Sequence, residues 1–327
     1  MIFAGVCFGS SAQAKDLQIY FIDVEGGQST LLVSPSGQSL LVDTGWPDTD
    51  RDIKRIAEAL QASGSKQIDF VVITHYHPDH VGGVPELLKQ IKVGEFIDHG
   101  PNIENDEMAP EGYAAYLKSM GSIKRVVARP GDRIPIRGLD VEVLAAAGAH
   151  ITQPVAGAGQ PNPNCASETK WPEDKTENGA SMGILVTYGD FRFVDLGDLT
   201  KDKELGLVCP SNLIGKADLF LVSHHGMNMS NTKSLVDALH PRVAIMENGA
   251  KKGDSPEAWQ TVHDSPGLQD LWQLHYTASS GDHNVAKDQI ANLDGDADGH
   301  SIKVVAQANG TFRVENSRNK VERTYKK

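Results

Sequence analysis

The chain has 327 residues, of which 39% are hydrophobic, 23% are charged and 6% are aromatic. This composition is typical of a globular protein with a sizeable core, folded as one large domain or two smaller ones. The 43 acidic side chains outnumber the 31 basic ones and give a formal charge of -12. Because such a surface repels a phosphate backbone, it argues against polymeric nucleic acid as a partner, although a metal in a cleft can reverse the local field. A small-molecule substrate is the expected partner.

The first sixteen residues, MIFAGVCFGSSAQAKD, are apolar and small up to an Ala-Gln-Ala just before Lys15. This pattern predicts a signal-peptide remnant at residues 1–14 and export to the periplasm or the medium. The basic n-region is missing, so the alternative is a buried strand at residues 2–8 of a cytoplasmic protein. No apolar run approaches the roughly 18 residues of a membrane span. Cys165 and Cys209 could form a disulfide in an exported protein, or remain two buried thiols.

In chain order, apolar runs at residues 17–24, 29–34 and 39–45 are separated by Gly-Gly and by Pro-Ser-Gly, which predicts a β-meander. Residues 51–63 carry apolar side chains with the i, i+3, i+4, i+7 spacing of an amphipathic helix. The next expected elements are a strand at 69–74, a helix at 83–91, a strand at 95–98 and a helix at 111–120. This alternation predicts stacked strands covered by helices.

Residues 148–178 are rich in Gly, Pro, Asn and Thr and show no periodicity. Such a stretch inside a compact domain is usually a functional loop or lid, and a flexible linker between two domains is the alternative. The elements expected after it are strands at 181–189, 191–198, 217–226 and 242–249, a helix at 230–239, and a hairpin at 301–316. Residues 294–300, DGDADGH, begin like a calcium loop, but Val305 stands where a bidentate Glu is required, so we expect a tight acidic turn.

One stretch, FVVITHYHPDHVGGV at residues 70–84, delivers four side chains of metal-ligand type directly after a predicted buried strand. They are His75, His77, Asp79 and His80. Alternate residues project to opposite sides after a strand, so His75 and His77 can share a side. Imidazoles and a carboxylate suit zinc, manganese or iron, and this many ligands in one short loop favours two ions.

Two further predicted strands end in residues of the same type. Asp198 closes RFVDLGD, and His224 and His225 close ADLFLVS. Because sites in α/β layers form at strand ends, these side chains are expected to converge with the histidine loop on one cleft. For Asp198 alone, the alternative is an ordinary turn or cap residue.

These residues resemble the metallo-β-lactamase-fold hydrolases, whose His-x-His-x-Asp-His signature is matched by His75 to His80. The resemblance also covers LLVDTG at residues 40–45, the Leu-Gly-Asp that contains Asp198, and the strand that ends at His225, and it spans residues 17–249. Within the family, HHGMNMS most resembles the hydrolase module of the bacterial competence proteins. The resemblance implies an α/β fold, a four-layer αββα sandwich, as a single domain over residues 15–327.

The resemblance also implies a dinuclear site, with two zinc ions expected and manganese or iron as alternatives. The implied ligands are His75 and His77 for the first metal, Asp79, His80 and His225 for the second, and Asp198 as the bridge. Asp79 is the expected acceptor of a proton from a metal-activated water. His224 is expected to face the substrate, where an imidazolium could donate to a phosphoryl or carbonyl oxygen. The sequence leaves open which member of the His224–His225 pair is the ligand.

One departure from the family concerns the first metal. Many members supply a further histidine ahead of the bridging aspartate, where this chain has Asn178 and Ser181. His150 could fold back as a substitute; the alternative is that His150 is an ordinary loop residue and that water or Asn178 fills the position. Asp43 is either an acceptor that orients a ligand imidazole or a strand-end cap. Trp171 either covers the substrate or anchors its loop to the surface.

The expected function is therefore metal-dependent hydrolysis, with a small phosphodiester or related ester as the first candidate substrate. A lactone or a β-lactam is the alternative substrate. A non-catalytic metal-binding or redox protein is the alternative class. A redox member would be expected to carry an acidic residue in place of a ligand histidine and an attached flavin-binding domain, and the sequence shows neither.

Overall fold

The computed structural model describes residues 16–47, 50–105, 108–293 and 298–327. The predicted signal remnant at 1–14, the alternative strand at 2–8 and most of the acidic turn at 294–300 lie outside these residues. Within them, no helix is both long enough and apolar enough to cross a bilayer.

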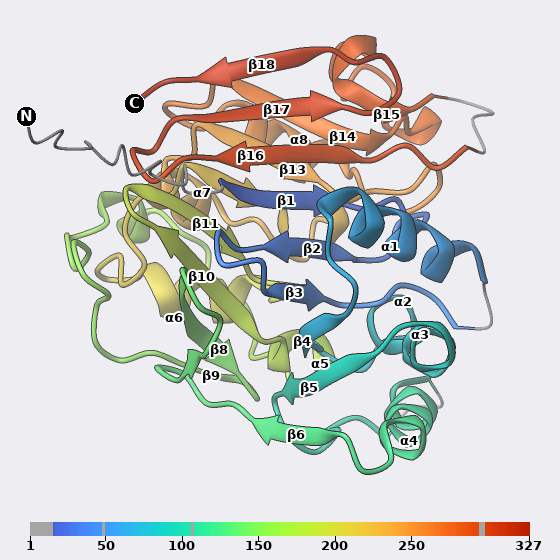
Figure 1. Ribbon diagram of the computed structural model, residues 1–327. Helices are drawn as coiled ribbons and strands as arrows, with labels where there is room; N and C mark the ends of the chain where they lie inside the picture. The colour runs from blue at the N-terminus through green and yellow to red at the C-terminus, as the bar shows by residue number, and fades with distance from the viewer. Residues whose placement is uncertain (1–15, 48–49, 106–107, 294–297) are drawn as a thin grey trace, which may run out of the picture.

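Two mixed sheets of nine strands each make up the centre of the described chain. The first has the order β18-β17-β16-β1-β2-β3-β4-β5-β6 and faces the viewer in Figure 1. Its strands are β1 Leu17–Phe21, β2 Thr30–Val33, β3 Ser39–Val42, β4 Ile68–Val72, β5 Val93–Asp98, β6 Lys124–Val127, β16 Ile302–Ala306, β17 Phe312–Asn316 and β18 Glu322–Tyr325. The predicted meander is present as antiparallel β1, β2 and β3, and β3 to β6 then run parallel.

The second sheet has the order β15-β14-β13-β12-β11-β10-β8-β7, with β9 paired to β8. Its strands are β7 Arg133–Ile134, β8 Asp140–Ala146, β9 Ala149–His150, β10 Gly183–Tyr188, β11 Phe191–Asp195, β12 Leu219–Leu221, β13 Val243–Met246, β14 Asp270–His275 and β15 Ile290–Asn292. Strands β11 to β15 are parallel, so their carboxyl ends meet at one edge of the sheet.

The helices cover the outer faces of the two sheets. They are α1 Asp50–Ser63, α2 Pro78–Val81, α3 Val84–Gln90, α4 Met108–Met120, α5 Glu177–Ala180, α6 Lys201–Val208, α7 Lys233–Leu239 and α8 Pro256–His263. The predicted stripe of α1 is buried at Ile53, Ile56 and Leu60. The predicted helix at 230–239 begins later, at Lys233, because the Thr232 side chain accepts the Leu235 N–H as a cap.

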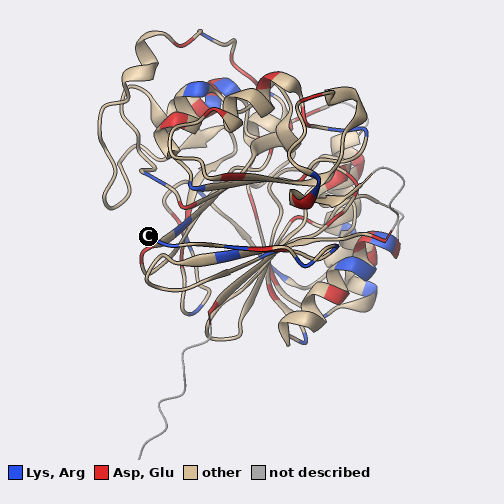
Figure 2. Ribbon diagram, turned by 90° about the horizontal axis from the view of Figure 1, so that it is seen from above, with Lys and Arg blue, Asp and Glu red and all other residues tan. Residues whose placement is uncertain are grey.

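Three apolar layers separate four layers of structure and confirm the predicted αββα sandwich. The central layer joins the two sheets, with Phe21 of β1 against Phe193 of β11 at 5.8 Å between ring centroids. A second layer packs the first sheet against α1, α3 and α4, and a third packs the other sheet against α6, α7 and α8. Charged side chains gather on the outer helices and loops, whereas the strands are mostly uncharged (Figure 2).

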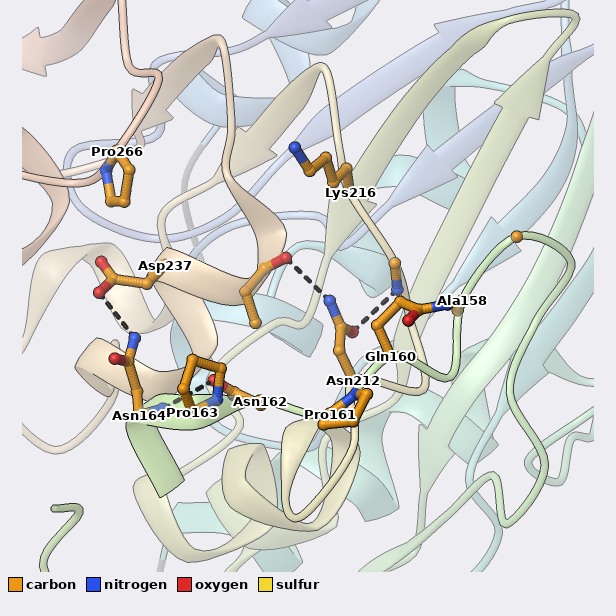
Figure 3. A pocket seen from close by; sticks show the side chains of 13 residues that line it. Ala158, Gln160, Pro161, Asn162, Pro163, Asn164, Asn212, Lys216, Asp237 and Pro266 are labelled. Atoms are coloured by element: carbon orange, nitrogen blue, oxygen red, sulfur yellow. Dashed lines mark hydrogen bonds between the residues drawn. The ribbon is translucent and has the colours of Figure 1, made fainter. Parts of the chain in front are cut away.

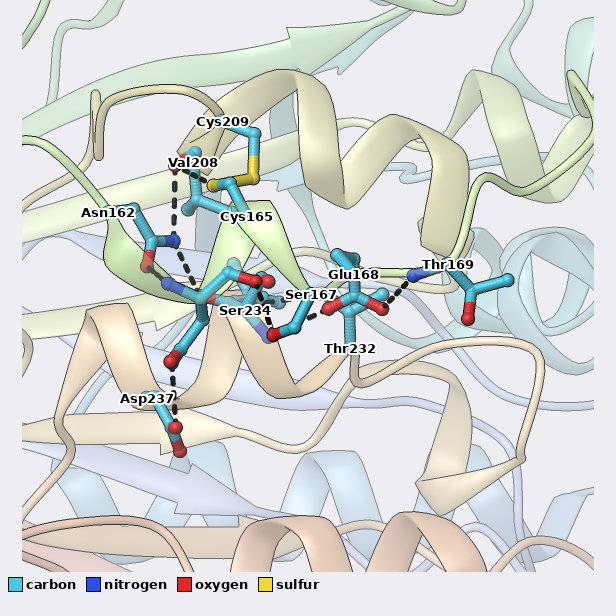
Figure 4. Close-up of a disulfide and its surroundings, with 12 residues drawn as sticks. Asn162, Cys165, Ser167, Glu168, Thr169, Val208, Cys209, Thr232, Ser234 and Asp237 are labelled. Carbon is cyan, nitrogen blue, oxygen red and sulfur yellow. Dashed lines mark hydrogen bonds between the residues drawn. A yellow bond between two sulfur atoms is a disulfide. The ribbon is translucent and has the colours of Figure 1, made fainter.

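The segment at 148–178 is more structured than predicted. It contains β9, the 3-10 turn η1 at Pro163–Ala166, and the start of α5. A disulfide joins Cys165 to Cys209, the residue that follows α6, so the alternative of two separate thiols is wrong (Figure 4). Backbone hydrogen bonds also hold the segment, among them Val155 N–H to Leu213 O at 2.9 Å. Sequence reasoning missed this order because the anchoring partners lie about fifty residues further along the chain.

Candidate metal centre

The histidine loop begins where β4 ends and turns sharply into α2. Pro78 occupies the first turn of α2, where its missing N–H costs nothing. Gly82 and Gly83 follow, and the chain from 44 to 47 presses against them. A Cβ at Gly82 would lie 2.4 Å from Pro47 N, and one at Gly83 would lie 2.1 Å from Thr44 O. Only glycine permits this close approach, which turns the loop side chains toward the second sheet.

The second sheet supplies its candidates from the carboxyl ends of β11 and β12. Asp198 lies three residues beyond β11, and His224 and His225 lie in a 3-10 turn directly after β12. Both histidines have left-handed backbone angles, with φ of 55° and 54°. Such a conformation costs energy for residues with a Cβ and is often found at functional sites. The His224 N–H donates to Gly197 O at 3.0 Å, which ties this turn to the segment that carries Asp198.

Four ligand-type side chains from the two sheets meet at one point: Asp79, His80, Asp198 and His225. All four are buried, and one ligand atom from each lies within 4.8 Å of the others. His225 Nε2 is 3.1 Å from Asp79 Oδ2, and His80 Nε2 is 3.2 Å from Asp198 Oδ2. We refer to these four residues as the first cluster.

His75 and His224 flank the first cluster on the side of Asp198. His75 Nε2 lies 3.9 Å and His224 Nε2 lies 3.3 Å from Asp198 Oδ2. Asp198 therefore has the central position expected of a bridging carboxylate. The His77 ring packs edge-on against His75 at 4.7 Å between centroids. Every residue for which a ligand role was predicted from the two strand ends and the loop thus lies in or next to one site.

Hydrogen bonds outside the first cluster set the orientation of its imidazoles. His80 Nδ1 lies 2.7 Å from Asp43 Oδ2, and His225 Nδ1 lies 3.1 Å from Glu247 O. With Nδ1 as the donor in each ring, Nε2 presents its lone pair to the cluster. Asp43 also accepts the Thr74 N–H at 2.8 Å, so it has both roles considered for it, imidazole acceptor and strand-end cap.

Both carboxylates of the first cluster are ionised, although burial opposes this. Burial raises the pKa of Asp79, but the neighbouring His80 and His225 outweigh burial and hold the pKa well below its usual value. Burial likewise opposes ionisation of Asp198, and His224, His80 and His225 together hold its pKa well below the usual range. Two negative charges are therefore available to a cation.

The imidazoles differ in protonation because their surroundings differ. Burial lowers the pKa of His75 well below its usual value and lowers that of His224 to about 4, so both rings are neutral near pH 7. Burial also opposes the charge on His80, but Asp198 and Asp79 outweigh it and raise its pKa well above the usual value. A metal ion would have to displace this proton, so metal binding competes with protons at His80.

Buried polar atoms without a hydrogen-bond partner show that the site fits a metal ion. Among the described residues, these atoms include His75 Nε2 and Asp198 Oδ1, both at the first cluster. Asn178 Oδ1 and Ser181 Oγ are buried without partners as well. An unsatisfied buried acceptor is costly, and a coordinated cation would satisfy it. Neutral imidazole and carboxylate donors suit zinc, manganese or iron.

Asn178 and Ser181 lie in a turn that runs alongside the histidine loop. The turn is attached on both sides, since the Tyr76 N–H donates to Glu177 Oε2 at 3.0 Å and the Met182 N–H donates to Thr74 O at 2.8 Å. These two hydrogen bonds place the turn beside residues 74–76 of the histidine loop. That Asn178 fills the position of the family's further histidine stays a prediction.

His150 lies outside the first cluster. Its Nδ1 is 2.8 Å from Ile151 O, and its ring packs against α6, where a Cβ at Gly206 would lie 2.6 Å from His150 Nε2. It is not part of the first cluster. The interpretation of His150 as a substitute ligand is therefore not supported, because pairing of β9 with β8 fixes its ring against the helix.

Two functional contacts were not found from the sequence. Glu104, in the loop after β5, accepts from His77 Nε2 at 3.0 Å and from the Glu177 N–H at 2.9 Å. This leaves His77 Nδ1 as the ring atom free to bind a metal. Lys252, in the turn after β13, contacts the Asp79 carboxylate through its ammonium group. No local pattern marks either residue, since both depend on loops that meet only in the fold.

Trp171 lies at the surface, in the segment that precedes α5. Its side chain is 39% exposed, and the Lys201 ammonium lies 4.3 Å from the centre of its ring. Trp171 lines a cavity of about 430 Å³ together with Thr200 and Met229. Thr200 follows Asp198 by two residues and Met229 is in the loop after His225, but no residue of the first cluster lines this cavity.

A different cavity, of about 500 Å³, lies under the segment at 157–164 and shares no residue with the first cluster (Figure 3). Its two central amides bind backbone carbonyls. Asn162 Nδ2 donates to Val208 O at 3.2 Å, and Asn212 Nδ2 donates to Ala238 O at 2.8 Å. These amides serve to hold the segment in place.

Comparison with known proteins agrees with this geometry. Residues 22–160 match the family model of the metallo-beta-lactamase superfamily. ComE operon protein 3 of Bacillus subtilis is 25% identical over 270 residues, which is 76% of this chain and 31% of that protein. Recombination protein 2 of Haemophilus influenzae is 25% identical over 234 residues, 71% of this chain and 24% of that protein. The chain thus spans about a third or less of these two relatives.

Among solved structures, a mutant of the CmlA beta-hydroxylase has a TM-score of 0.50 at 16% identity, covering 81% of this chain and 53% of that one. This level of identity shows the fold alone. The match over residues 22–160 and the two-sheet sandwich show a metallo-β-lactamase fold, and the first cluster is a group of residues that could hold a metal ion. The superfamily consists generally of metal-dependent hydrolases, and the two relatives agree with the resemblance seen in the sequence.

Proposed function

We propose that the protein is a metal-dependent hydrolase that cleaves a small phosphodiester or a related ester at a dinuclear site. The observation that carries the proposal is the first cluster, four buried ligand atoms within 4.8 Å of one another in a fold used by metallohydrolases. Two sheets and several loops are needed to build it. Two buried atoms at this site, His75 Nε2 and Asp198 Oδ1, have no hydrogen-bond partner, and a bound metal ion would satisfy them.

The residues would divide between two metal ions. The first would be held by His75, His77 and the Asn178 oxygen, the second by Asp79, His80 and His225, and both by Asp198. Zinc is the first candidate, with manganese or iron as alternatives. When bound, such ions lower the pKa of a water molecule toward neutrality and stabilise negative charge that develops on the substrate.

The chain's own groups move the proton and orient the substrate. Asp79 is ionised, and its carboxylate faces the site, so it is the proposed acceptor of a proton from the attacking water. His224 is not the imidazolium that the sequence led us to expect, since burial lowers its pKa to about 4. As a neutral imidazole it can donate only from one ring nitrogen. Ser230 Oγ lies 3.2 Å from its Nδ1 and would fix which one.

Size and charge favour a small substrate. The net charge of -12 opposes long nucleic acids, and the cavity beside Trp171, of about 430 Å³, is of the size that holds a small molecule. A lactone or a β-lactam would also fit these features. A chromogenic panel of bis(p-nitrophenyl) phosphate, a lactone and a β-lactam separates the three. Faster turnover of the phosphodiester than of the other two supports the proposal. Turnover of only the lactone or the β-lactam would show that the substrate is of that class instead.

A non-catalytic or redox role is the alternative class, because this fold also occurs in a beta-hydroxylase. Metal analysis of protein purified without added metal distinguishes the classes when it is combined with the substrate panel. Two equivalents of zinc or manganese with hydrolysis support the proposal. Two equivalents of iron with no hydrolysis would favour the redox role.

We also propose that the protein is exported. The Cys165–Cys209 disulfide supports this, because such bonds persist in oxidising compartments and are rare in the cytosol. The test is the location of the full-length protein after cell fractionation, with free thiols measured in the same fractions. A cytosolic protein with two free thiols at these positions would contradict the proposal.

A further inference from the structure

Backbone contacts hold the segment that carries Lys252 against the residues proposed to bind the second metal ion. The Gly249 N–H donates to Lys252 O at 2.8 Å and closes the turn after β13. The next residues pack on the turn that carries His225, since the Asp254 N–H donates to His225 O at 3.0 Å. A Cβ at Gly253 would lie 2.1 Å from His225 O. The backbone of Lys252 is therefore fixed beside His225, a candidate metal ligand.

The Gly26–Gly27 pair fixes the lysine from the other side. A Cβ at Gly26, whose φ is +82°, would lie 3.1 Å from Lys252 Cβ, and one at Gly27 would lie 2.4 Å from Asp79 O. The loop between β1 and β2 can pass between Asp79 and the lysine turn only without side chains. This close packing explains the Gly-Gly that separates the first two predicted strands.

The ammonium group of Lys252 ends at the edge of the first cluster. It contacts Asp79 Oδ2, and it lies 4.9 Å from the centre of the Trp46 ring. The lysine side chain is 29% exposed, whereas Asp79 is 8% exposed. The charge thus lies between the buried ligands and solvent, where a substrate would enter.

An ion pair with Asp79 does not by itself account for this placement. If Asp79 coordinates a metal ion, its charge is shared with that ion, and the ammonium then faces a second cation at short range. A lysine held there needs another negative partner. The proposed substrate supplies one, because a phosphodiester keeps an anionic oxygen at neutral pH, whereas a lactone does not.

We infer that Lys252 binds the anionic oxygen of a phosphodiester substrate and is a specificity-determining residue of the site. The inference rests on the proposed function. Trp46 would act as a positioning residue that keeps the ammonium at the mouth of the site through a cation–π contact. Selection for anionic over neutral esters follows from this arrangement.

The test compares three variants of the zinc-loaded full chain, with inorganic phosphate as the probe and calorimetry as the readout. Lys252→Met should weaken phosphate binding about tenfold or more, and Lys252→Arg should stay within about threefold of wild type. Lys251→Met is the matched control, because it removes the same charge from an exposed neighbour and should have no effect. Zinc content, measured by mass spectrometry, should be equal in all of them.

Kinetics give the second readout. Lys252→Met should raise the KM for bis(p-nitrophenyl) phosphate and leave that for the uncharged p-nitrophenyl acetate unchanged. Equal phosphate affinity in Lys252→Met and wild type would overturn the inference. A Lys252→Met variant with altered zinc content and unchanged phosphate binding would overturn it as well. A chain that binds phosphate through Lys252 but hydrolyses no ester would refute the proposed function and leave the inference standing.

Discussion

Within the described residues, two groups of acidic and histidine side chains have the spacing of a metal site, and they differ in whether their buried side-chain atoms find hydrogen-bond partners. The first cluster joins the two sheets near the ends of β4, β11 and β12. The second cluster consists of Asp23, Glu25 and His275, and its ligand atoms also lie within 4.8 Å of one another.

The second cluster contains its own cation. Arg55, whose side chain is 8% exposed, lies 2.9 Å from Asp23 Oδ2 and 3.4 Å from Glu25 Oε1. His275 Nε2 lies 2.7 Å from Asp23 Oδ1. Burial opposes ionisation of Asp23, but the hydrogen bond from His275 and the charges of His275 and Arg55 outweigh it and lower its pKa. This cluster is complete without a metal.

The first cluster is incomplete in its hydrogen bonds. Lys252 reaches only Asp79, at the solvent edge, and Asp198 Oδ1 and His75 Nε2 keep no hydrogen-bond partner. The comparison teaches that ligand type and spacing alone do not define a metal site. What separates the two clusters is whether their buried side-chain atoms find hydrogen-bond partners within the chain.

The largest effect is expected from removing a ligand of the first cluster or its loop. His77→Ala and Asp79→Ala should each lower metal content. Each should also lower hydrolysis by more than the roughly 10–100-fold lost when a residue that only orients a ligand is replaced. The fold should remain, because these side chains line a site and fill no core. Metal content, turnover and the unfolding midpoint are the measurements. Asp23→Asn, in the second cluster, is the control and should retain the metal. Wild-type turnover in either variant under metal-replete conditions would remove the residue from the site.

Breaking the second cluster should cost stability and leave chemistry intact. Arg55→Leu leaves the buried Asp23 carboxylate and the half-buried Glu25 carboxylate without their cation, so we expect the free energy of unfolding to fall by about 3–5 kcal/mol. Urea unfolding gives this value, and metal content per folded chain should not change. A loss below about 1 kcal/mol would mean that Arg55 is not what completes this cluster.

The two neighbouring histidines should separate metal binding from turnover. His225→Ala should lower metal content and metal affinity, because its Nε2 lies inside the first cluster. His224→Ala should mainly lower kcat, by about 10–100-fold, with metal content retained. Metal titration and steady-state kinetics on both variants distinguish the roles. Small and equal effects on both readouts would place neither residue in the site.

Glu204 offers a third arrangement, a buried acid held by backbone N–H groups in place of a cation. Burial raises its pKa to about 7, although the N–H groups of Thr232 and Asn231 oppose this. Between the ordinary value of 4.5 and about 7, the folded chain keeps a proton that the unfolded chain has lost. Stability therefore falls as the pH rises through this window, by roughly 3 kcal/mol.

The variant Glu204→Gln tests this because an amide does not titrate there. Its free energy of unfolding should change less between pH 4.5 and pH 7 than that of the wild type. Urea unfolding at several pH values measures the slope. Identical slopes in the two proteins would show that Glu204 is ionised throughout the window.

The smallest effect is expected at the exposed Trp171. If Trp171 covers a bound substrate, Trp171→Ala should raise KM by about threefold to tenfold and leave metal content unchanged. Kinetics and metal analysis on one preparation suffice. Unchanged KM with a lower unfolding midpoint would show instead that Trp171 anchors its segment to the surface.

Much of the fold and several residues of the candidate site could be predicted from the sequence alone. The alternation of apolar runs and amphipathic helices predicted stacked strands covered by helices, since each pattern reports which face of its own element is buried, and the family resemblance implied the αββα sandwich. His75, His77, Asp79 and His80 could be identified because they are neighbours in the chain, so a strand end and a proline turn bring them together locally. Asp198 and His225 could be inferred because parallel strands end at a common edge.

The tertiary structure alone decided which groups complete or orient that site. Glu104 reaches His77 and Lys252 reaches Asp79 across gaps of 27 and 173 residues. It also decided that His150 faces α6, that Cys165 meets Cys209, and that Arg55 and not a metal neutralises the second cluster. These contacts depend on loop paths and on the packing of one sheet against the other, and the periodicity of a single element carries no information about either.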